Sequence, residues 1–154
     1  MSARMRASKV HRDVVSVDLP EGAFGGGYPH WKALLFHSLA RRGQVLRLLR
    51  GDSHAESTSD AIATALGGSA DFILIDGDHS YEGAKRDFEL YRTLLSDQGF
   101  LAFHDIVPGL PEKVGGVPKL WAELKAQFPH LELVKDRGQG GYGIGLGFPS
   151  VEAR

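Results

Sequence analysis

Two carboxylates and an imidazole stand within four residues, at Asp76, Asp78 and His79, directly after the apolar run of residues 72–75. A short, unbroken apolar run predicts a strand that is buried on both faces of a parallel sheet. Open α/β sheets bind their ligands at the carboxyl ends of the strands. The cluster therefore stands where a ligand site is expected.

A second polar cluster, His104-Asp105, follows the apolar residues 100–103. If the two strands are neighbours, their carboxyl ends lie roughly 5 Å apart and the clusters meet. Carboxylate oxygens with one imidazole suit Mg²⁺ or another divalent cation better than a structural zinc. We expect Asp76 and Asp105 as anionic ligands and His104 as a third ligand, although His104 could instead face the core.

His79 is the candidate general base, because an imidazole titrates near working pH and stands three residues after Asp76. The alternative for this cluster is structural, since Asp78 or Ser80 could cap the following helix. Two such clusters at the ends of neighbouring strands favour a functional site over capping alone.

Three more residues end earlier strands and could bind a nucleoside. Asp18 could accept hydrogen bonds from a ribose, or could be a turn residue before Pro20. Asp52 and Ser53 could bind an adenine edge, or could cap the next helix. The glycine-rich residues 22–27 lack the order of a phosphate-binding loop, so they are expected to cover the mouth of the site or to pack.

The elements that must position these residues alternate along the chain. Strands are predicted at 14–17, 45–49, 72–75 and 100–103, helices at 31–39, 56–66, 84–95 and 118–128, and a closing hairpin at 131–134 and 142–148. Ser53 and Glu56 have capping-box spacing before the second helix. This order predicts a Rossmann-like, doubly wound α/β fold with a mostly parallel sheet and a C-terminal antiparallel hairpin. We expect one domain at 13–149 with tails at 1–12 and 150–154.

The composition narrows the class of protein. The chain has 154 residues, a formal net charge of −1 and no cysteine. The absence of cysteine excludes disulfides, thiolate catalysis and cysteine-ligated zinc, and the balanced charge does not favour nucleic acid or an anionic membrane. There is no apolar stretch of about 20 residues and no signal-peptide pattern, so a cytoplasmic protein with a small-molecule substrate is expected.

The stretches D-F-I-L-I-D-G-D-H-S-Y-E-G-A-K-R-D (71–87) and G-F-L-A-F-H-D-I (99–106) resemble the class I S-adenosylmethionine-dependent methyltransferases. The resemblance is to the small-molecule O-methyltransferase branch, with its catechol, caffeoyl-coenzyme A, macrolide-sugar and cephalosporin-cluster enzymes, and it covers about residues 14–148. It implies S-adenosylmethionine and Mg²⁺ as cofactors. By position the resemblance assigns the residues as follows: metal ligands Asp76, His104 and Asp105, general base His79, ribose ligand Asp18, and adenine-side residues Asp52 and Ser53.

Two departures accompany the resemblance. The family usually has an acidic or amide residue where His104 stands, which puts that ligand in doubt. The family's first strand and its glycine-rich loop should also precede Val14, so we expect a sheet that lacks its central member. The expected activity is metal-assisted O-methyl transfer to a small-molecule hydroxyl. The alternatives are an inactive domain that serves binding or homo-oligomerisation, and a metal-dependent hydrolase that uses the same carboxylates.

Overall fold

The structure is a computed structural model, and it describes residues 12–19 and 27–148. The predicted tails and the glycine-rich loop lie largely outside these residues, but Arg12, placed in the N-terminal tail, begins a strand. The elements are, in chain order, β1 (Arg12–Asp18), α1 (His30–Ser38), β2 (Gln44–Arg50), α2 (Glu56–Leu66), β3 (Ala70–Ile75), α3 (Tyr81–Tyr91), the 3₁₀ turn η1 (Arg92–Leu94), β4 (Leu95–His104), α4 (Pro111–Val114), α5 (Val117–Leu124), β5 (His130–Leu133) and β6 (Ile144–Gly147).

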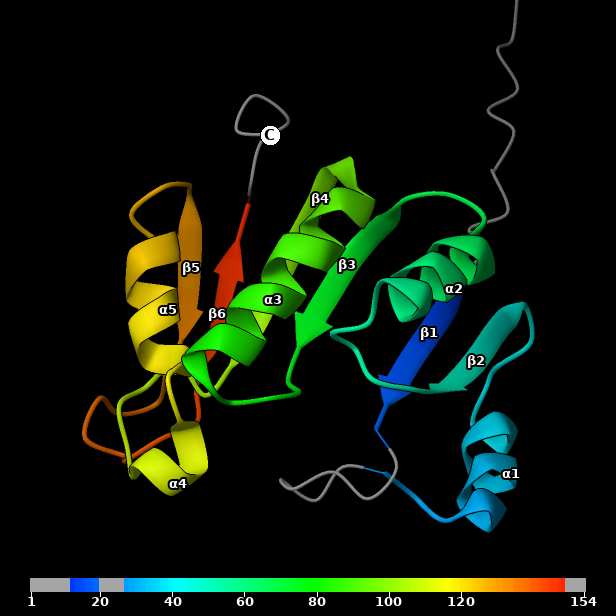
Figure 1. The fold of residues 1–154 in the computed structure, drawn as a ribbon, viewed down its shortest axis with the longest axis horizontal. Helices are drawn as coiled ribbons and strands as arrows, with labels where there is room; N and C mark the ends of the chain where they lie inside the picture. The colour runs from blue at the N-terminus through cyan, green and yellow to red at the C-terminus, as the bar shows by residue number, and fades with distance from the viewer. Residues whose placement is uncertain (1–11, 20–26, 149–154) are drawn as a thin grey trace, which may run out of the picture.

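The strands form two sheets. β1 and β2 make a parallel pair, and the second sheet has the order β3-β4-β6-β5. β3 and β4 are parallel, while β6 runs antiparallel to both β4 and β5, which confirms the predicted hairpin. Strands and helices alternate up to the hairpin, so the Rossmann-like α/β fold is confirmed (Figure 1).

The sheet is interrupted where one continuous sheet was expected. Figure 1 shows β1 between β2 and β3, yet no ladder within residues 12–19 and 27–148 joins β1 to β3. The two halves are linked instead through the helices, because α2 contacts both β1 and α3. None of the helices in the described ranges is both long and apolar enough to cross a bilayer.

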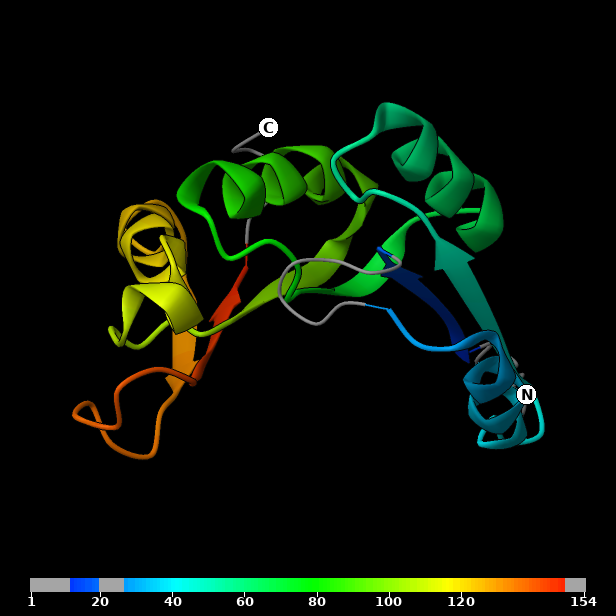
Figure 2. The same ribbon diagram turned by 60° about the horizontal axis from the view of Figure 1, so that its bottom comes forward.

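The core lies between the four-stranded sheet and the helices α3 and α5, which cover one side of it (Figure 2). Leu101 and Phe103 of β4 meet Leu120 and Trp121 of α5, all at most 2% exposed. The Trp121 ring packs directly on Gly145 of β6, where any side chain would collide with it. Burial of these large apolar side chains is the main stabilising contribution to this half of the molecule.

The prediction that the strand before Asp76 is buried on both faces is wrong. Phe72 and Leu74 of β3 are 50% and 51% exposed, so β3 is not buried on both faces. The described helices that pack on β3 and β4 cover only the opposite face. The predicted apolar face of α1 is exposed as well, at Trp31, Leu34 and Leu39.

Two element boundaries also differ from the prediction. The helix predicted through Leu95 ends at Tyr91, and Leu95 begins β4 because it pairs with Ala70 and is buried in the sheet. The capping box is wrong: the N-cap of α2 is Ala55, which has no side chain that could accept a cap hydrogen bond. The short helix α4 was not predicted.

Candidate functional site

The two polar clusters meet, as predicted. β3 and β4 pair in parallel with Ile75 opposite Phe103, so Asp76 and His104 are the next residues along. Nδ1 of His104 lies 3.1 Å from Oδ1 of Asp76 and 3.4 Å from Oδ1 of Asp105. The carboxylates that follow two neighbouring strands therefore lie close together, with an imidazole between them.

His79 lies against both carboxylates. Its Nε2 is 3.6 Å from Oδ1 of Asp76, and its Nδ1 is 3.5 Å from Oδ2 of Asp105. Nδ1 also forms a 2.5 Å hydrogen bond with the backbone carbonyl of Lys113. Since a carbonyl oxygen only accepts, Nδ1 carries a hydrogen, and in the neutral imidazole Nε2 is the nitrogen that can accept a proton.

The capping roles fall on other residues of the β3–α3 loop. Ser80 is the N-cap of α3 and accepts a hydrogen bond from the Gly83 N–H at 3.0 Å. Oδ1 of Asp78 accepts the Ser80 N–H at 2.8 Å. Capping therefore explains Asp78 and Ser80, and it leaves Asp76 without a structural role at the helix N-terminus.

The loop that carries His79 is held by residues just after α4. The Gly116 N–H donates to the His79 carbonyl at 2.7 Å. A Cβ at position 116 would lie 2.5 Å from the Tyr81 Cβ, and a Cβ at Gly115 would collide with the His79 carbonyl. Only glycine permits so close an approach, so residues 115 and 116 fix the backbone of His79.

Asp105 has an uncommon backbone conformation. Its φ is 59°, in the left-handed region, and Tyr142 has φ 61°. Oδ1 of Asp105 accepts the Tyr142 N–H at 2.9 Å, and the Val107 N–H donates to the Tyr142 carbonyl at 3.0 Å. Aspartate tolerates this region better than most residues, and the two bonds hold the strained pair in place.

The predicted metal site is not supported by this arrangement. With the side chains as they lie, no group of three or more His, Asp or Glu residues within the described ranges could hold a metal ion. Asp105 already accepts a backbone hydrogen bond, and Asp76 pairs with two imidazoles. The Nδ1 atom of His104 is nevertheless buried without a hydrogen-bond partner, beside two carboxylate oxygens.

The residues predicted to bind a nucleoside end β1 and β2. Oδ1 of Asp18 accepts the Gly27 N–H at 2.8 Å, which is the turn role. The Asp18 carbonyl accepts the Gly51 N–H at 3.1 Å, so these strand ends lie side by side. A Cβ at Gly77 would be 3.9 Å from Oγ of Ser53, which places the end of β2 beside the loop of Asp76. Binding roles for Asp18, Asp52 and Ser53 remain predictions.

Comparison with known proteins shows which family the chain belongs to. Residues 1–106 match the family described as a methyltransferase domain, which is more than half of the chain. The chain belongs to this family. It is also 34% identical over 94 residues to the uncharacterised protein y4gI of Sinorhizobium fredii (strain NBRC 101917 / NGR234). That match covers 61% of this chain and 10% of the relative, so the chain spans only a small part of the relative's length.

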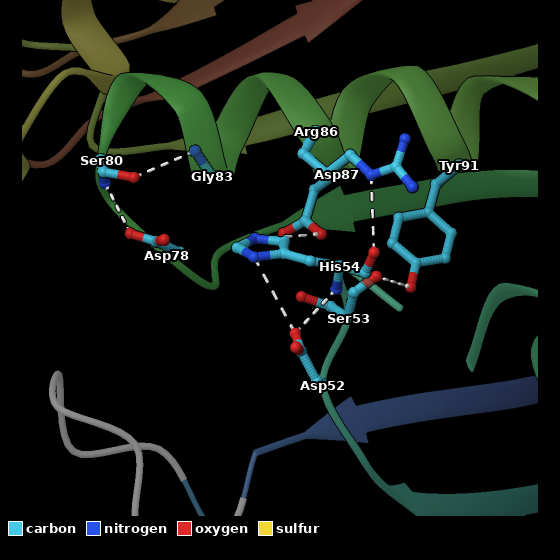
Figure 3. A network of polar contacts seen from close by, with 9 residues as sticks. All are labelled: Asp52, Ser53, His54, Asp78, Ser80, Gly83, Arg86, Asp87 and Tyr91. Carbon is cyan, nitrogen blue, oxygen red and sulfur yellow. Dashed lines mark hydrogen bonds and ion pairs between the residues drawn. The ribbon is translucent and has the colours of Figure 1, made fainter. Parts of the chain in front are cut away.

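Sequence reasoning missed a second polar cluster of this methyltransferase domain, which Figure 3 shows. Asp87 on α3 is 4% exposed and lies near His54 and Ser53 of the β2–α2 loop. Burial raises the pKa of the Asp87 carboxyl, while a hydrogen bond with Ser53 and the nearby His54 oppose the rise. The signal was present in the sequence: Asp87 interrupts the apolar stripe Ala84, Phe88 and Tyr91.

Tyr91 completes this cluster. Its hydroxyl donates to the Ser53 carbonyl at 2.6 Å. Burial, with the nearby Asp87 charge, raises the pKa of Tyr91 to about 12. The hydroxyl therefore remains a hydrogen-bond donor across the range of working pH.

Proposed function

We propose that this methyltransferase domain transfers a methyl group from S-adenosylmethionine to the hydroxyl of a small molecule, with His79 as the general base. Family membership supports methyl transfer in general and implies the cofactor. The observation that carries the finer proposal is the position of His79, 3.6 Å from Asp76 and 3.5 Å from Asp105 at the carboxyl ends of β3 and β4.

In the proposed reaction, Nε2 of His79 accepts the proton of the substrate hydroxyl. The oxygen attacks the sulfonium methyl carbon, a C–O bond forms, the C–S bond breaks and S-adenosylhomocysteine leaves. The Lys113 carbonyl keeps the imidazole in the required tautomer, and Asp76 stabilises the imidazolium that forms. Correct placement of the two reacting groups supplies most of the acceleration.

The cofactor is proposed to lie across the ends of β1 and β2. Asp18 would accept hydrogen bonds from the ribose, and Asp52 and Ser53 would contact the adenine. The adjacency of these strand ends and the closeness of Ser53 to Gly77 support this placement, since they bring the cofactor side and the His79 side together. With a formal net charge of −1, the chain has no overall positive field that would favour nucleic acid as the substrate.

Assistance by Mg²⁺ is a separate proposal, and no step of the reaction above depends on it. The buried Nδ1 of His104 supports it, because this atom lies beside two carboxylates and has no hydrogen-bond partner, so it would gain from a ligand. The side chains would have to rearrange around the ion. Titration with Mn²⁺ followed by electron paramagnetic resonance tests it: Asp76→Ala should abolish binding, and unchanged binding would refute the assignment.

Methyl transfer can be tested without knowing the natural acceptor. The protein is incubated with methyl-labelled S-adenosylmethionine and a panel of catechols and hydroxylated sugars, with and without Mg²⁺, and labelled product is measured. The proposal is supported if the wild type labels at least one acceptor and the His79→Gln variant does not label it. Label that persists in His79→Gln would show that another group removes the proton.

An inactive domain that serves binding or homo-oligomerisation is the alternative. Two observations favour it: within residues 12–19 and 27–148 no ladder joins β1 to β3, and apolar side chains of α1 and β3 are exposed. A stable dimer with no affinity for S-adenosylmethionine would support this alternative over the enzyme.

A further inference from the structure

Helix α3 holds the β2–α2 loop through the backbone carbonyls of two successive residues. The Tyr91 hydroxyl donates to the Ser53 carbonyl at 2.6 Å, and Nε of Arg86 donates to the His54 carbonyl at 3.5 Å. Arg86 also pairs with Glu56 at 3.4 Å. One face of α3 therefore carries the contacts that fix the loop following β2 (Figure 3).

Asp87 lies on the same face, at the centre of these contacts. Its side chain is 6% exposed, and its Oδ2 atom would be 3.2 Å from a Cβ at Gly77. Gly77 belongs to the β3–α3 loop, so the Asp87 carboxylate lies between that loop and the β2–α2 loop. The contact of its Oδ1 with Nε2 of His54, at 3.8 Å, links it to the second of these loops.

His54 lies between a buried and an exposed carboxylate. Its Nε2 is 3.8 Å from Oδ1 of Asp87, and its Nδ1 is 3.9 Å from Oδ1 of Asp52. The backbone N–H of His54 also donates a hydrogen bond to Oδ1 of Asp52 at 2.9 Å. The ring of His54 thus connects Asp87 to Asp52, as Figure 3 shows.

The facing atoms of Asp87 and His54 are the unusual feature. Both Oδ1 of Asp87 and Nε2 of His54 are buried without a hydrogen-bond partner. Separated by 3.8 Å, they are too close for a water to lie between them, and a small rotation of the ring would join them directly. Burying a carboxylate costs free energy of folding unless the charge is paired. If packing were the only role of position 87, an aliphatic side chain would stabilise the fold more than aspartate does.

We propose that Asp87 is a positioning residue, which holds Ser53 and, through His54, Asp52 in the geometry that binds the cofactor. The inference rests on the proposed function for the identity of the ligand. Asp87 touches no reacting atom and acts only through the loop. Loss of its charge should loosen residues 51–55 and weaken cofactor binding, while the global fold is kept.

The test uses Asp87→Asn, which keeps the shape of the side chain, and Asp97→Asn as a matched control on an exposed residue of β4. Affinity for S-adenosylhomocysteine is measured by calorimetry, and amide hydrogen exchange of residues 51–55 is measured without ligand. We expect roughly tenfold weaker binding and faster exchange confined to the loop in Asp87→Asn, because the buried charge that faces His54 is lost. The Asp97→Asn control should match the wild type in both affinity and amide exchange.

The two readouts separate failure of this inference from failure of the proposed function. If the wild type binds no S-adenosylhomocysteine, the proposed function fails, and loop exchange alone decides whether Asp87 positions residues 51–55. Unchanged loop exchange in Asp87→Asn overturns the inference, and so does an equal increase across the whole chain. Should Asp87→Asn fail to fold, His54→Asn removes the other partner and is expected to give the same local increase; unchanged exchange there is equally contradictory.

Discussion

The carboxylate of Asp105 accepts a hydrogen bond from the backbone N–H of Tyr142 at 2.9 Å, and both residues have left-handed backbones. They are 37 positions apart in the chain. This contact, together with the bond from the Val107 N–H to the Tyr142 carbonyl at 3.0 Å, joins the loop after β4 to the loop before β6 and so fixes one side of the candidate site.

Asp105→Ala should therefore destabilise the fold while Asp105→Asn should not. Alanine is unfavourable at φ 59° and leaves the Tyr142 N–H unpaired, so we expect a loss of roughly 2–3 kcal/mol in the free energy of unfolding. Asparagine tolerates the left-handed region and keeps an acceptor, so its loss should stay below about 1 kcal/mol. Urea unfolding measures both, and equal stability of the alanine variant and the wild type would contradict the strain argument.

His79→Gln should abolish most turnover without affecting cofactor binding. A positioned general base contributes roughly 10²–10⁴ in rate, so kcat should fall by that factor. His37→Gln on α1 is the control, because His37 is exposed and far along the chain from the site. A loss of affinity for S-adenosylhomocysteine in His79→Gln, with kcat retained, would mean that His79 binds the cofactor instead.

Glu132 makes the stability of the α5–β5 packing depend on pH. Its carboxylate accepts bonds from Lys125 at 2.9 Å and from the Trp121 ring at 2.7 Å, and also pairs with Arg137. The Lys125 bond, with those from Trp121 and Arg137, lowers the pKa of Glu132 to about 2. A lowered pKa stabilises the fold at neutral pH, and this contribution is lost as the pH falls from the unfolded value of 4.5 through about 2.

Glu132→Gln should accordingly be less stable than the wild type at pH 7, by roughly 1–2 kcal/mol after allowance for solvent screening. The difference should shrink as the pH is lowered from 4.5 toward 2. Glu89→Gln is the control, since the Glu89–Lys85 pair is exposed and 3.8 Å long, and its loss should cost about 0.5 kcal/mol or less. A pH-independent difference for Glu132→Gln would show that lost hydrogen bonds, and not the charge, explain the effect.

Gly116→Ala should disturb the site through the backbone of His79. The added Cβ would lie 2.5 Å from the Tyr81 Cβ and 2.6 Å from the Tyr81 nitrogen, so the β3–α3 loop must move. We expect a destabilisation of roughly 1–3 kcal/mol, together with faster amide exchange in residues 76–80. Gly68→Ala, where a Cβ meets nothing within 4 Å, should change stability by less than about 0.5 kcal/mol. Similar behaviour of the two variants would contradict the close approach.

The sequence predicted the meeting of Asp76 with His104 and Asp105 because parallel strands end at one edge of a sheet. Apolar runs indicated the strands, and the meeting was predicted on the condition that the two strands are neighbours, which the pairing of β3 with β4 confirms. The exposure of Phe72 and Leu74 could not be predicted, because an apolar residue does not indicate whether another element covers it. Leu95 continued the helical period of Tyr91, and its pairing with Ala70 in the sheet overrode that local pattern.

The contacts that fix the site side chains were beyond prediction for a different reason. Asp105 meets Tyr142, and His79 meets Lys113, only after the loops at the carboxyl edge fold over one another. No spacing in one sequence encodes such contacts. Asp87 is different, because its role could have been predicted although it was missed. A carboxylate within an apolar helical stripe indicates a buried polar partner even without coordinates.

Calorimetric titration of the protein with S-adenosylhomocysteine tests the central claim most directly, because methyl transfer requires that this product leave the same site that binds the cofactor. The account predicts one molecule bound per chain with a dissociation constant roughly in the micromolar range. It also predicts clearly weaker binding by Asp18→Ala. A protein that unfolds cooperatively, and is therefore folded, yet gives no binding heat at several temperatures would contradict the proposed activity.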